Sequence, residues 1–274
     1  MKLKVDDISF NVILNETDLD TNKTPVVFLH GFTGCAKDWL FLFDKIPLNF
    51  FPIAIDLIGH GETGTIDNLE NYSSNEIVHH LDSIFNKLNL GKIIIAGYSM
   101  GGRAAISFCI KHPQRIKSAI LESSTPGIED FSLKKQRAEF DLLLAEKIKY
   151  GGTESFINFW FDTPLFESLK KLPNFESIRN ERYKNNPVGL SNMLAGFSAG
   201  IMTDYWEKLR LLDFPVLLIT GELDEKFTNI NKKMLCGIQK AYHQTVINCG
   251  HNVHLEKPEL FIKLVNDFLN NMNE

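Results

Sequence analysis

A serine between glycines is the residue whose setting most clearly predicts chemistry. The stretch GYSMG (97–101) places Ser99 in a GxSxG pattern, after the apolar run KIIIA and before GRAAISFCIKH, which has a helical pattern. A serine on a sharp turn between strand and helix exposes its hydroxyl, and glycines leave the room that such a turn requires. We predict that Ser99 is catalytic and that the backbone N–H of Met100 stabilises an oxyanion beside it.

A serine hydroxyl is a weak nucleophile and a weak base, so it needs a base and an acid that orients that base. Both follow later in the chain. GELDEKF places Asp224 just after the apolar run PVLLIT, and GHNVHLEKP places His251 just after QTVINC. Because the carboxyl ends of parallel strands share one edge of a sheet, we predict that Ser99, Asp224 and His251 form a catalytic triad.

Other polar side chains at the same predicted edge are alternatives. His254 is the rival base, and we expect a supporting role for it because it lies at the start of the next helix. The rival acids are Glu122 and, more distantly, Glu222 and Asp56. His30 in LHGFTG and His60 in DLIGHGET are predicted to hold their loops. The backbone N–H of Phe32, in the first of these loops, is the predicted second oxyanion donor.

Six short apolar runs predict the elements that position these residues. Continuous β-branched runs are typical of parallel strands buried on both faces, and the segments between them, such as 71–88 and 259–272, have apolar residues at helical spacing. The runs are PVVFLHG (25–31), FPIAIDL (51–57), KIIIAGYS (92–99), KSAILESS (117–124), PVLLITGE (215–222) and QTVINCG (244–250). They predict a doubly wound, mostly parallel α/β sheet. The alternating residues 3–16 predict an antiparallel hairpin at its edge.

One interval has no strand pattern. From Gly127 to Asp213 the chain shows only helical stretches, at 133–149, 153–161 and 176–184. This insertion leaves the carboxyl edge of the sheet, where open α/β sheets bind ligands. We therefore predict a core of residues 1–127 and 213–274 and a helical lid of residues 128–212. The alternative is a helical elaboration with no part in binding.

Composition excludes several classes of function. The chain has 274 residues, of which 44% are hydrophobic and 23% charged, with a formal net charge of -5. This is ordinary for a globular protein, and no block of lysine or arginine predicts a nucleic acid or a membrane as partner. The four cysteines are widely spaced without a CxxC pair, so neither a zinc site nor a disulfide framework is predicted. A small-molecule ligand is favoured.

The opening residues bear on the compartment. MKLKVDDISFNV has acidic residues where a signal peptide has an apolar segment, and no apolar run approaches the roughly 20 residues of a membrane span. We expect a protein that is not secreted and that works in the cytoplasm or in an organelle interior such as the plastid stroma.

Five motifs together carry a family resemblance. LHGF, DLxGHG, GYSMGG, GExD and GHxxHxE resemble the α/β-hydrolase superfamily over essentially the whole length. Within it, GYSMGGR, LESSTPGI, GELDEKF and GHNVHLEKP are similar to the MenH family, the 2-succinyl-6-hydroxy-2,4-cyclohexadiene-1-carboxylate synthases of menaquinone and phylloquinone biosynthesis. The resemblance implies a lyase that eliminates pyruvate from 2-succinyl-5-enolpyruvyl-6-hydroxy-3-cyclohexene-1-carboxylate without a metal or an organic cofactor.

The resemblance also implies substrate-binding residues. MenH-like enzymes bind a polycarboxylate through arginines of core and lid, which correspond here to Arg103, Arg137 and Arg182. Trp160 matches the lid tryptophan of the family, and Tyr98 the residue before the serine. A guanidinium binds a carboxylate through two parallel bonds, each contributing about 1.5–3 kcal/mol when charge-assisted.

Without the resemblance, sequence position supports these assignments unequally. Arg103 falls on the first turn of a helix, where the dipole disfavours a cation, so binding an anion explains it better than solvent exposure does. Arg137 and Arg182 lie in charge-rich helices, where a solvated face paired with neighbouring glutamates is the ordinary interpretation. Arg179 is an alternative to Arg182, and Trp160 also suits the core of the lid.

We predict that Asp224 orients His251 and that the His251–Ser99 pair removes a proton from the substrate ring. The alternative enzyme is a carboxylesterase or carbon–carbon bond hydrolase in which Ser99 is a covalent nucleophile. A receptor on this fold is a further alternative, which the intact triad disfavours.

Overall fold

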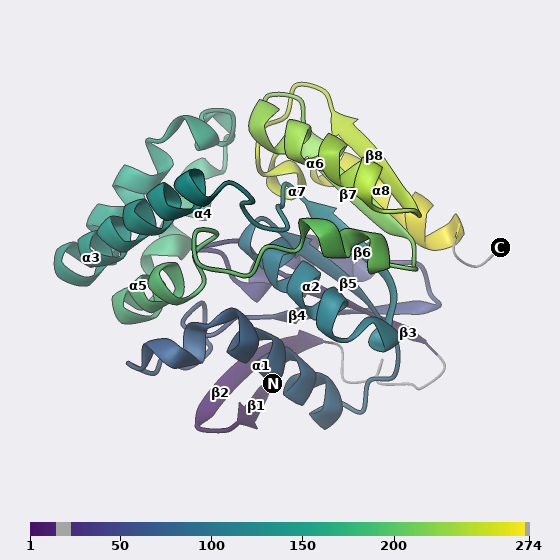
Figure 1. Cartoon of the computed structure of the whole chain (residues 1–274), viewed down its shortest axis with the longest axis horizontal. Helices are drawn as coiled ribbons and strands as arrows, with labels where there is room; N and C mark the ends of the chain where they lie inside the picture. Colours follow the sequence, from purple (N-terminus) through teal and green to yellow (C-terminus); the bar gives the residue numbers. More distant parts are fainter. Residues whose placement is uncertain (15–22, 272–274) are drawn as a thin grey trace.

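An eight-stranded sheet forms the centre of the molecule (Figure 1). The computed structural model describes residues 1–14 and 23–271. The strands are β1 (Lys2–Val5), β2 (Ile8–Leu14), β3 (Thr24–Leu29), β4 (Phe50–Ile55), β5 (Ile93–Tyr98), β6 (Ile116–Glu122), β7 (Val216–Gly221) and β8 (Ala241–Val246). Their order is β1-β2-β4-β3-β5-β6-β7-β8, and every pair from β4 onward is parallel. The predicted α/β fold class is confirmed.

The predicted strands agree with the observed ones, with one shift. All six apolar runs supply strands β3 to β8, and β1 and β2 form the predicted antiparallel hairpin at the edge. Residues 15 and 16 of that predicted hairpin, and residue 272 of the last predicted helix, lie outside the described residues. The last strand, β8, spans Ala241–Val246 rather than 244–250. As an edge strand with exposed residues it alternates, and the predicted residues 247–250 form the following turn instead.

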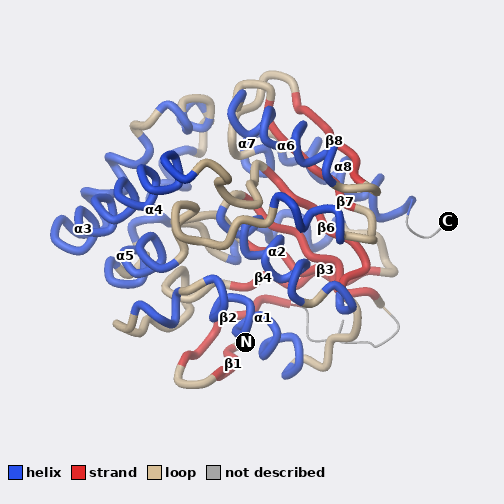
Figure 2. The backbone as a smooth tube through the Cα atoms, in the orientation of Figure 1, coloured by secondary structure: helices blue, strands red, loops and turns tan. Residues whose placement is uncertain are grey.

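Helices cover both faces of the sheet (Figure 2). One face carries α1 (Ser74–Lys87), α2 (Met100–Lys111) and α6 (Glu225–Gly237), and the other carries the 3-10 helix η2 (Ala36–Lys45), α7 (Val253–Glu256) and α8 (Pro258–Asn271). Short 3-10 helices η3 (Leu69–Tyr72), η4 (Pro113–Arg115) and η7 (Trp206–Leu211) connect the larger elements.

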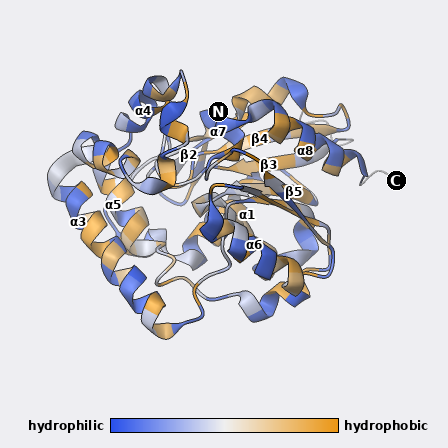
Figure 3. Ribbon diagram, turned by 90° about the horizontal axis from the view of Figure 1, so that it is seen from above, coloured by the Kyte–Doolittle hydropathy of each residue, from blue (hydrophilic) through white to orange (hydrophobic). Residues whose placement is uncertain are grey.

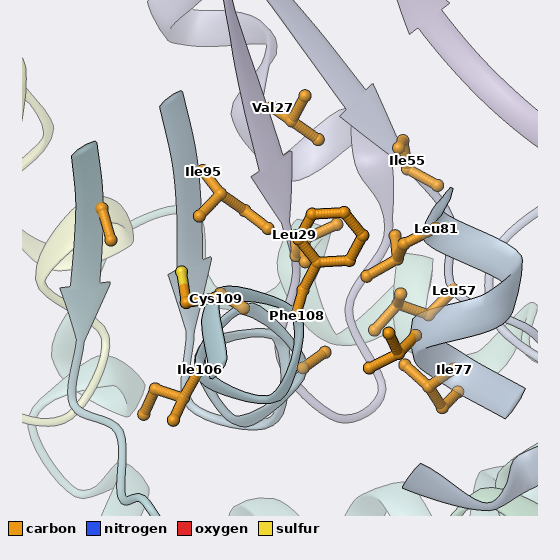
Figure 4. Packing of buried hydrophobic residues seen from close by; sticks show 14 of the residues in the cluster. Val27, Leu29, Ile55, Leu57, Ile77, Leu81, Ile95, Ile106, Phe108 and Cys109 are labelled. Atoms are coloured by element: carbon orange, nitrogen blue, oxygen red, sulfur yellow. The ribbon is translucent and has the colours of Figure 1, made fainter. Parts of the chain in front are cut away.

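Alternate residues of each strand enter opposite hydrophobic clusters. Val27 and Leu29 of β3 pack with Phe108 of α2 and Leu81 of α1 (Figure 4), while Phe28 packs on the other face. This alternation follows from the period of two in a strand. Because both faces are apolar, the strands are fixed in register and their carboxyl ends form one rigid edge.

The predicted helical insertion lies between β6 and β7. It contains α3 (Phe131–Phe161), the 3-10 helices η5 (Pro164–Phe166) and η6 (Leu169–Lys171), α4 (Phe175–Tyr183) and α5 (Pro187–Gly196). Apolar residues alternate with polar ones along α3 (Figure 3), and its buried residues join a third hydrophobic cluster, separate from the two of the sheet. Within α3 the two helices predicted at 133–149 and 153–161 are both present, and they meet at a kink where Gly152 has non-helical torsion angles, φ 78° and ψ 167°.

Helix α5 was missing from the sequence interpretation. Its residues PVGLSNMLAG include glycine, serine and asparagine, which have low helix propensity. The start signal was nevertheless present, since Asn186 caps the helix by accepting from the N–H groups of Val188 and Gly189, and Pro187 occupies its first position. Packing of α5 against α3 then stabilises a helix whose own propensity is weak.

No helix within residues 1–14 and 23–271 is long and apolar enough to cross a membrane. Over the same residues, no cluster of three or more His, Cys, Asp or Glu side chains is arranged to hold a metal ion.

Candidate active site

Ser99 occupies a strained turn between β5 and α2. Its φ of 49° and ψ of -105° lie in a region that residues other than glycine rarely adopt. The turn depends on its glycines: a Cβ at Gly97 would collide with the backbone of Gly101, and one at Gly101 with the backbone of Leu29. The chain therefore holds a strained serine in place by close backbone packing, as the GxSxG interpretation predicts.

The three residues predicted to form a triad lie together. Nδ1 of His251 donates to Oδ2 of Asp224 at 2.6 Å, and Nε2 of His251 accepts from Oγ of Ser99 at 3.1 Å. Asp224 is the N-cap of α6 after β7, and His251 lies in the loop after β8. Both side chains are buried, at 4% and 2% exposure, so little water competes for these bonds. The geometry is that of a hydroxyl activated by an oriented imidazole.

The two predicted oxyanion donors belong to adjoining backbone segments. Met100 is the first residue of α2, so its N–H has no acceptor within the helix. Phe32 lies in the loop after β3, where Gly31 packs against the ring of Tyr98, the residue before the serine. That close approach, which a side chain at position 31 would prevent, sets the Phe32 loop beside the turn of Ser99.

The rival acid and the rival base pair with each other. Oε1 of Glu122 accepts from Nδ1 of His254 at 2.9 Å and from the backbone N–H of His254 at 3.1 Å. Both side chains are almost fully buried. The ring of Tyr98 lies between the two histidines, with centroids 5.2 Å from His251 and 4.7 Å from His254. Glu122 thus supports His254 rather than the imidazole beside Ser99.

The remaining candidates hold loops. Asp56 accepts from the backbone N–H of Ala36 and from the side chain of Asn11, and Glu222 accepts from the backbone N–H of Asn248. Nε2 of His30 accepts from the backbone N–H of Leu57 at 3.0 Å, and Nδ1 of His60 donates to the carbonyl of Ile58 at 3.2 Å. Burial lowers the pKa of both histidines, so each imidazole is neutral near pH 7 and suited to such bonds.

A cavity of about 230 Å³ opens beside Ser99. Arg103 of α2 and Arg137 of α3 both line it. Arg103 packs 4.8 Å from the ring centroid of Phe197 and donates to the carbonyl of that residue. Burial, together with the positive charge of Arg137, lowers the pKa of Arg103 to about 9. Core and lid therefore each present a guanidinium to the space next to the serine.

Lys226 lines the same cavity and was not among the predicted residues. Partial burial and the charge of Arg137 lower its pKa. The signal was present in GELDEKF, where a lysine follows the triad acid on the first turn of a helix. A cation is disfavoured there by the helix dipole, for the same reason that singled out Arg103.

Arg182 and Tyr98 lie apart from this cavity. They line a hollow of about 20 Å³, where NH1 of Arg182 forms an ion pair with Oδ1 of Asp38 at 2.8 Å. Asp38 neutralises the guanidinium and joins the lid helix α4 to η2 of the core. Arg179, the alternative, pairs with Glu176 on its own helix. Burial raises the pKa of the Tyr98 hydroxyl well above its usual value, so this residue stays neutral.

Trp160 packs in the core of the lid. Its ring lies 5.6 Å from that of Phe156, 5.7 Å from that of Phe166 and 5.7 Å from that of Phe32, measured between centroids. Among the described residues it is not part of the lining of the cavity at Ser99. Its contact with Phe32 nevertheless joins the lid to the loop of the predicted oxyanion donor.

A further hollow, of about 320 Å³, borders the predicted acid and base. Asp224 and His251 form part of its wall, and the lid residues Pro164, Ser168 and Lys171 form another part. Asp224 and His251 thus lie at the junction of the helical insertion and the core.

Comparisons with known proteins agree with this architecture. The family model described as alpha/beta hydrolase fold matches residues 24–258. A putative 2-succinyl-6-hydroxy-2,4-cyclohexadiene-1-carboxylate synthase of Bacillus subtilis is 41% identical over 246 residues, 89% of each chain. A synthase of the same name from an Enterobacter species is 30% identical, over 85% of this chain and 86% of that one.

A solved structure is also similar. MenH from S. aureus superposes with a TM-score of 0.91 and 32% identity, covering 96% of this chain and 99% of that one. The chain therefore belongs to the α/β-hydrolase family and, within it, to the MenH group of 2-succinyl-6-hydroxy-2,4-cyclohexadiene-1-carboxylate synthases.

Proposed function

We propose that this chain is a 2-succinyl-6-hydroxy-2,4-cyclohexadiene-1-carboxylate synthase of menaquinone biosynthesis. It eliminates pyruvate from 2-succinyl-5-enolpyruvyl-6-hydroxy-3-cyclohexene-1-carboxylate. Membership of the MenH group supports this assignment. The observation that carries it is the placement of Arg103 and Arg137 on the cavity that Ser99 lines, because cations from core and lid suit a polyanionic substrate.

The reaction is a proton abstraction followed by loss of a leaving group. The product has double bonds at ring positions 2 and 4 and the substrate has one at position 3, so the proton leaves ring carbon 2, next to the succinyl ketone. The electron pair of that C–H bond forms the new double bond at position 2, the former double bond moves to position 4, and the C5–O bond breaks. The enolpyruvyl group leaves with the electrons of that bond and becomes pyruvate on protonation.

The triad acts in this scheme as a general base. Asp224 holds the tautomer of His251 in which Nε2 is free to accept a proton, and the hydrogen bond from Ser99 couples the hydroxyl to it. The abstracted proton passes to the His251–Ser99 pair, and Asp224 stabilises the imidazolium that forms. No acyl-enzyme is required.

The oxyanion donors serve the ketone. Removing the proton from carbon 2 moves negative charge onto the oxygen of the adjacent succinyl carbonyl. Backbone N–H groups of Met100 and Phe32 are placed to stabilise that enolate oxygen, and fixed donors of this kind are effective because they need no reorganisation. This gives both predicted donors a role in an elimination as well as in acyl transfer.

The basic residues bind the carboxylates of the substrate. Its name specifies one carboxylate on the ring, one on the succinyl arm and one on the enolpyruvyl group, and we assign Arg103 and Arg137 to this set. Arg182, which is already paired with Asp38, we assign to holding α4 against the core. The helices of residues 128–212 form the lid, and Tyr98 and Trp160 shape the space under it.

A substitution of the serine tests the function. Ser99→Ala is expected to lower kcat for pyruvate release by about 10³-fold, because the hydroxyl that couples to His251 is lost. Substrate is generated with the upstream enzymes, and pyruvate is followed by its reduction with lactate dehydrogenase. Ser155→Ala, an exposed serine of α3, is the matched control. Full turnover in Ser99→Ala would exclude the serine from the chemistry.

The same assay separates the lyase from the alternative hydrolase. Rapid hydrolysis of neutral p-nitrophenyl butyrate with an initial burst, and no release of pyruvate from the enolpyruvyl substrate, would identify Ser99 as a covalent nucleophile. We expect the reverse, since a neutral ester leaves the cations of the cavity without a partner.

A further inference from the structure

Lys226 is a further basic residue at the cavity beside Ser99. It is two residues beyond Asp224, on the first turn of α6, and it lines the cavity together with Ser99, Arg103 and Arg137. The residue as a whole is exposed, so its side chain reaches the cavity from the rim. A lysine suits such a position, because its flexible stem carries a compact charge that can follow a ligand.

The positive charges of this cavity exceed the negative ones. Arg137 pairs with Asp141, and that carboxylate also accepts from the hydroxyl of Ser198. Across residues 1–14 and 23–271, neither Arg103 nor Lys226 forms an ion pair. The acid nearest in sequence to Lys226, Asp224, is bonded to His251. Among the described residues these two cations therefore contact aromatic rings, and Arg103 a backbone carbonyl, but neither has an acid as partner.

The two cations also lie in positions that are unfavourable without an anion. Both are on the first turn of their helices, whose amino ends carry partial positive charge. Burial lowers the pKa of each, and the nearby charge of Arg137 lowers it further. A bound carboxylate would offset both the helix dipole and the charge repulsion, since it is attracted by the helix ends and by every cation of the cavity.

A neighbouring lysine shows what a lysine of this helix does when it serves only the surface. Lys233, two turns further along α6, forms an ion pair with Glu129 outside the cavity. Lys226 has no such partner among the described residues and its side chain is directed to the cavity instead. An ion pair with a surface acid therefore accounts for Lys233, whereas Lys226 forms no such pair within the described residues.

We propose that Lys226 is a further substrate-binding residue, whose ammonium group holds a carboxylate of the substrate at the rim of the cavity that Arg103 and Arg137 line. The inference rests on the proposed function for the identity of that substrate. The start of α6 would then have two roles. Asp224 orients the base, and Lys226, on the first turn of the helix, binds the substrate on which the base acts.

The experiment compares three variants by steady-state kinetics of pyruvate release. Lys226→Met is expected to raise KM about tenfold with kcat changed less than about threefold, because a charge-assisted bond present in both ground and transition states is lost. Lys226→Arg keeps the charge and is expected to hold KM within about threefold of wild type. Lys232→Met, an exposed lysine of the same helix, is the matched control and leaves both constants unchanged.

The outcomes separate this inference from the proposed function. A KM for Lys226→Met within twofold of wild type, in an enzyme whose wild type releases pyruvate, would overturn the inference and leave the function standing. An equal rise in KM for Lys226→Met and Lys232→Met would also overturn it, since it would reflect net charge alone. A wild-type enzyme that releases no pyruvate would overturn the proposed function and the inference with it.

Discussion

Two buried acid–histidine pairs lie side by side in this protein and differ in what they can do. Asp224 accepts from His251 at 2.6 Å and Glu122 accepts from His254 at 2.9 Å. The far nitrogen of His251 meets the hydroxyl of Ser99, whereas the ring of His254 stacks on Trp39 with centroids 4.5 Å apart. A carboxylate that orients an imidazole is therefore not enough for a general base.

The surroundings explain the difference. Ser99 lines a cavity large enough for part of a substrate, and His251 itself lines the hollow between lid and core. His254 borders the small hollow that contains Tyr98 and Arg182, and its backbone N–H is bonded to Glu122 as well. The second pair thus joins β6 to α7, and His254 packs against the ring of Tyr98, which also contacts His251.

An isosteric substitution of Asp224 tests whether the Asp224–His251 pair is required for turnover. Asp224→Asn is expected to lower kcat for pyruvate release by about 10³-fold, because the amide stabilises neither the required tautomer nor the imidazolium. Pyruvate release measured against wild type checks this. Far-ultraviolet circular dichroism should show the same helix content in both proteins. A fall of less than about tenfold would mean that His251 needs no anionic partner.

Breaking the second pair should affect stability rather than turnover. His254→Phe retains an aromatic ring against Trp39 but leaves the buried carboxylate of Glu122 without its imidazole partner. We expect the free energy of unfolding to fall by about 3 kcal/mol, because an uncompensated charge remains buried. Urea denaturation measures this, and kcat at a temperature where the variant is folded should remain within about fivefold of wild type. A loss of kcat as large as that of Asp224→Asn would show that both pairs take part in catalysis.

The smallest effect is expected from the matched change on the other acid. Glu122→Gln keeps an oxygen that can accept from His254 and loses only the assistance of the charge, so the free energy of unfolding should fall by about 1 kcal/mol. The same denaturation and pyruvate assays, run beside Asp224→Asn, give the sharpest contrast between the pairs. Equal kinetic defects in these two variants would remove the distinction drawn here.

The sequence predicted most of the fold because its signals are local. Strands β3 to β7 contain continuous apolar runs, and the turn at Ser99 is marked by glycines, because the turn leaves no room for side chains at those positions. Helix α5 was not predicted because its stability comes from packing on α3 rather than from the helix propensity of its own residues. The limits of β8 were displaced because an edge strand with one exposed face has no continuous apolar run.

The serine, acid and histidine of the candidate site could be predicted from the sequence more completely than its arginines and lysine. Ser99, Asp224 and His251 each follow a predicted strand, so the parallel sheet brings them to one edge by geometry alone. The partners of the arginines depend on contacts distant in sequence. Arg182 finds Asp38 across 144 positions of the chain, and no local pattern could have indicated that pair. Lys226 carried a local signal, but its membership of the cavity depends on where α3 places Arg137.

The residues by themselves thus determined the strands, the sharp turn at Ser99 and the order serine, acid, histidine, because backbone conformation and burial respond to neighbours a few positions away. Only the tertiary structure decided which of two histidines reaches the serine, that two of the three arginines already have an anionic partner, and that a lysine joins the cavity. Those outcomes depend on the relative placement of lid and core, which brings together charges that the chain keeps far apart.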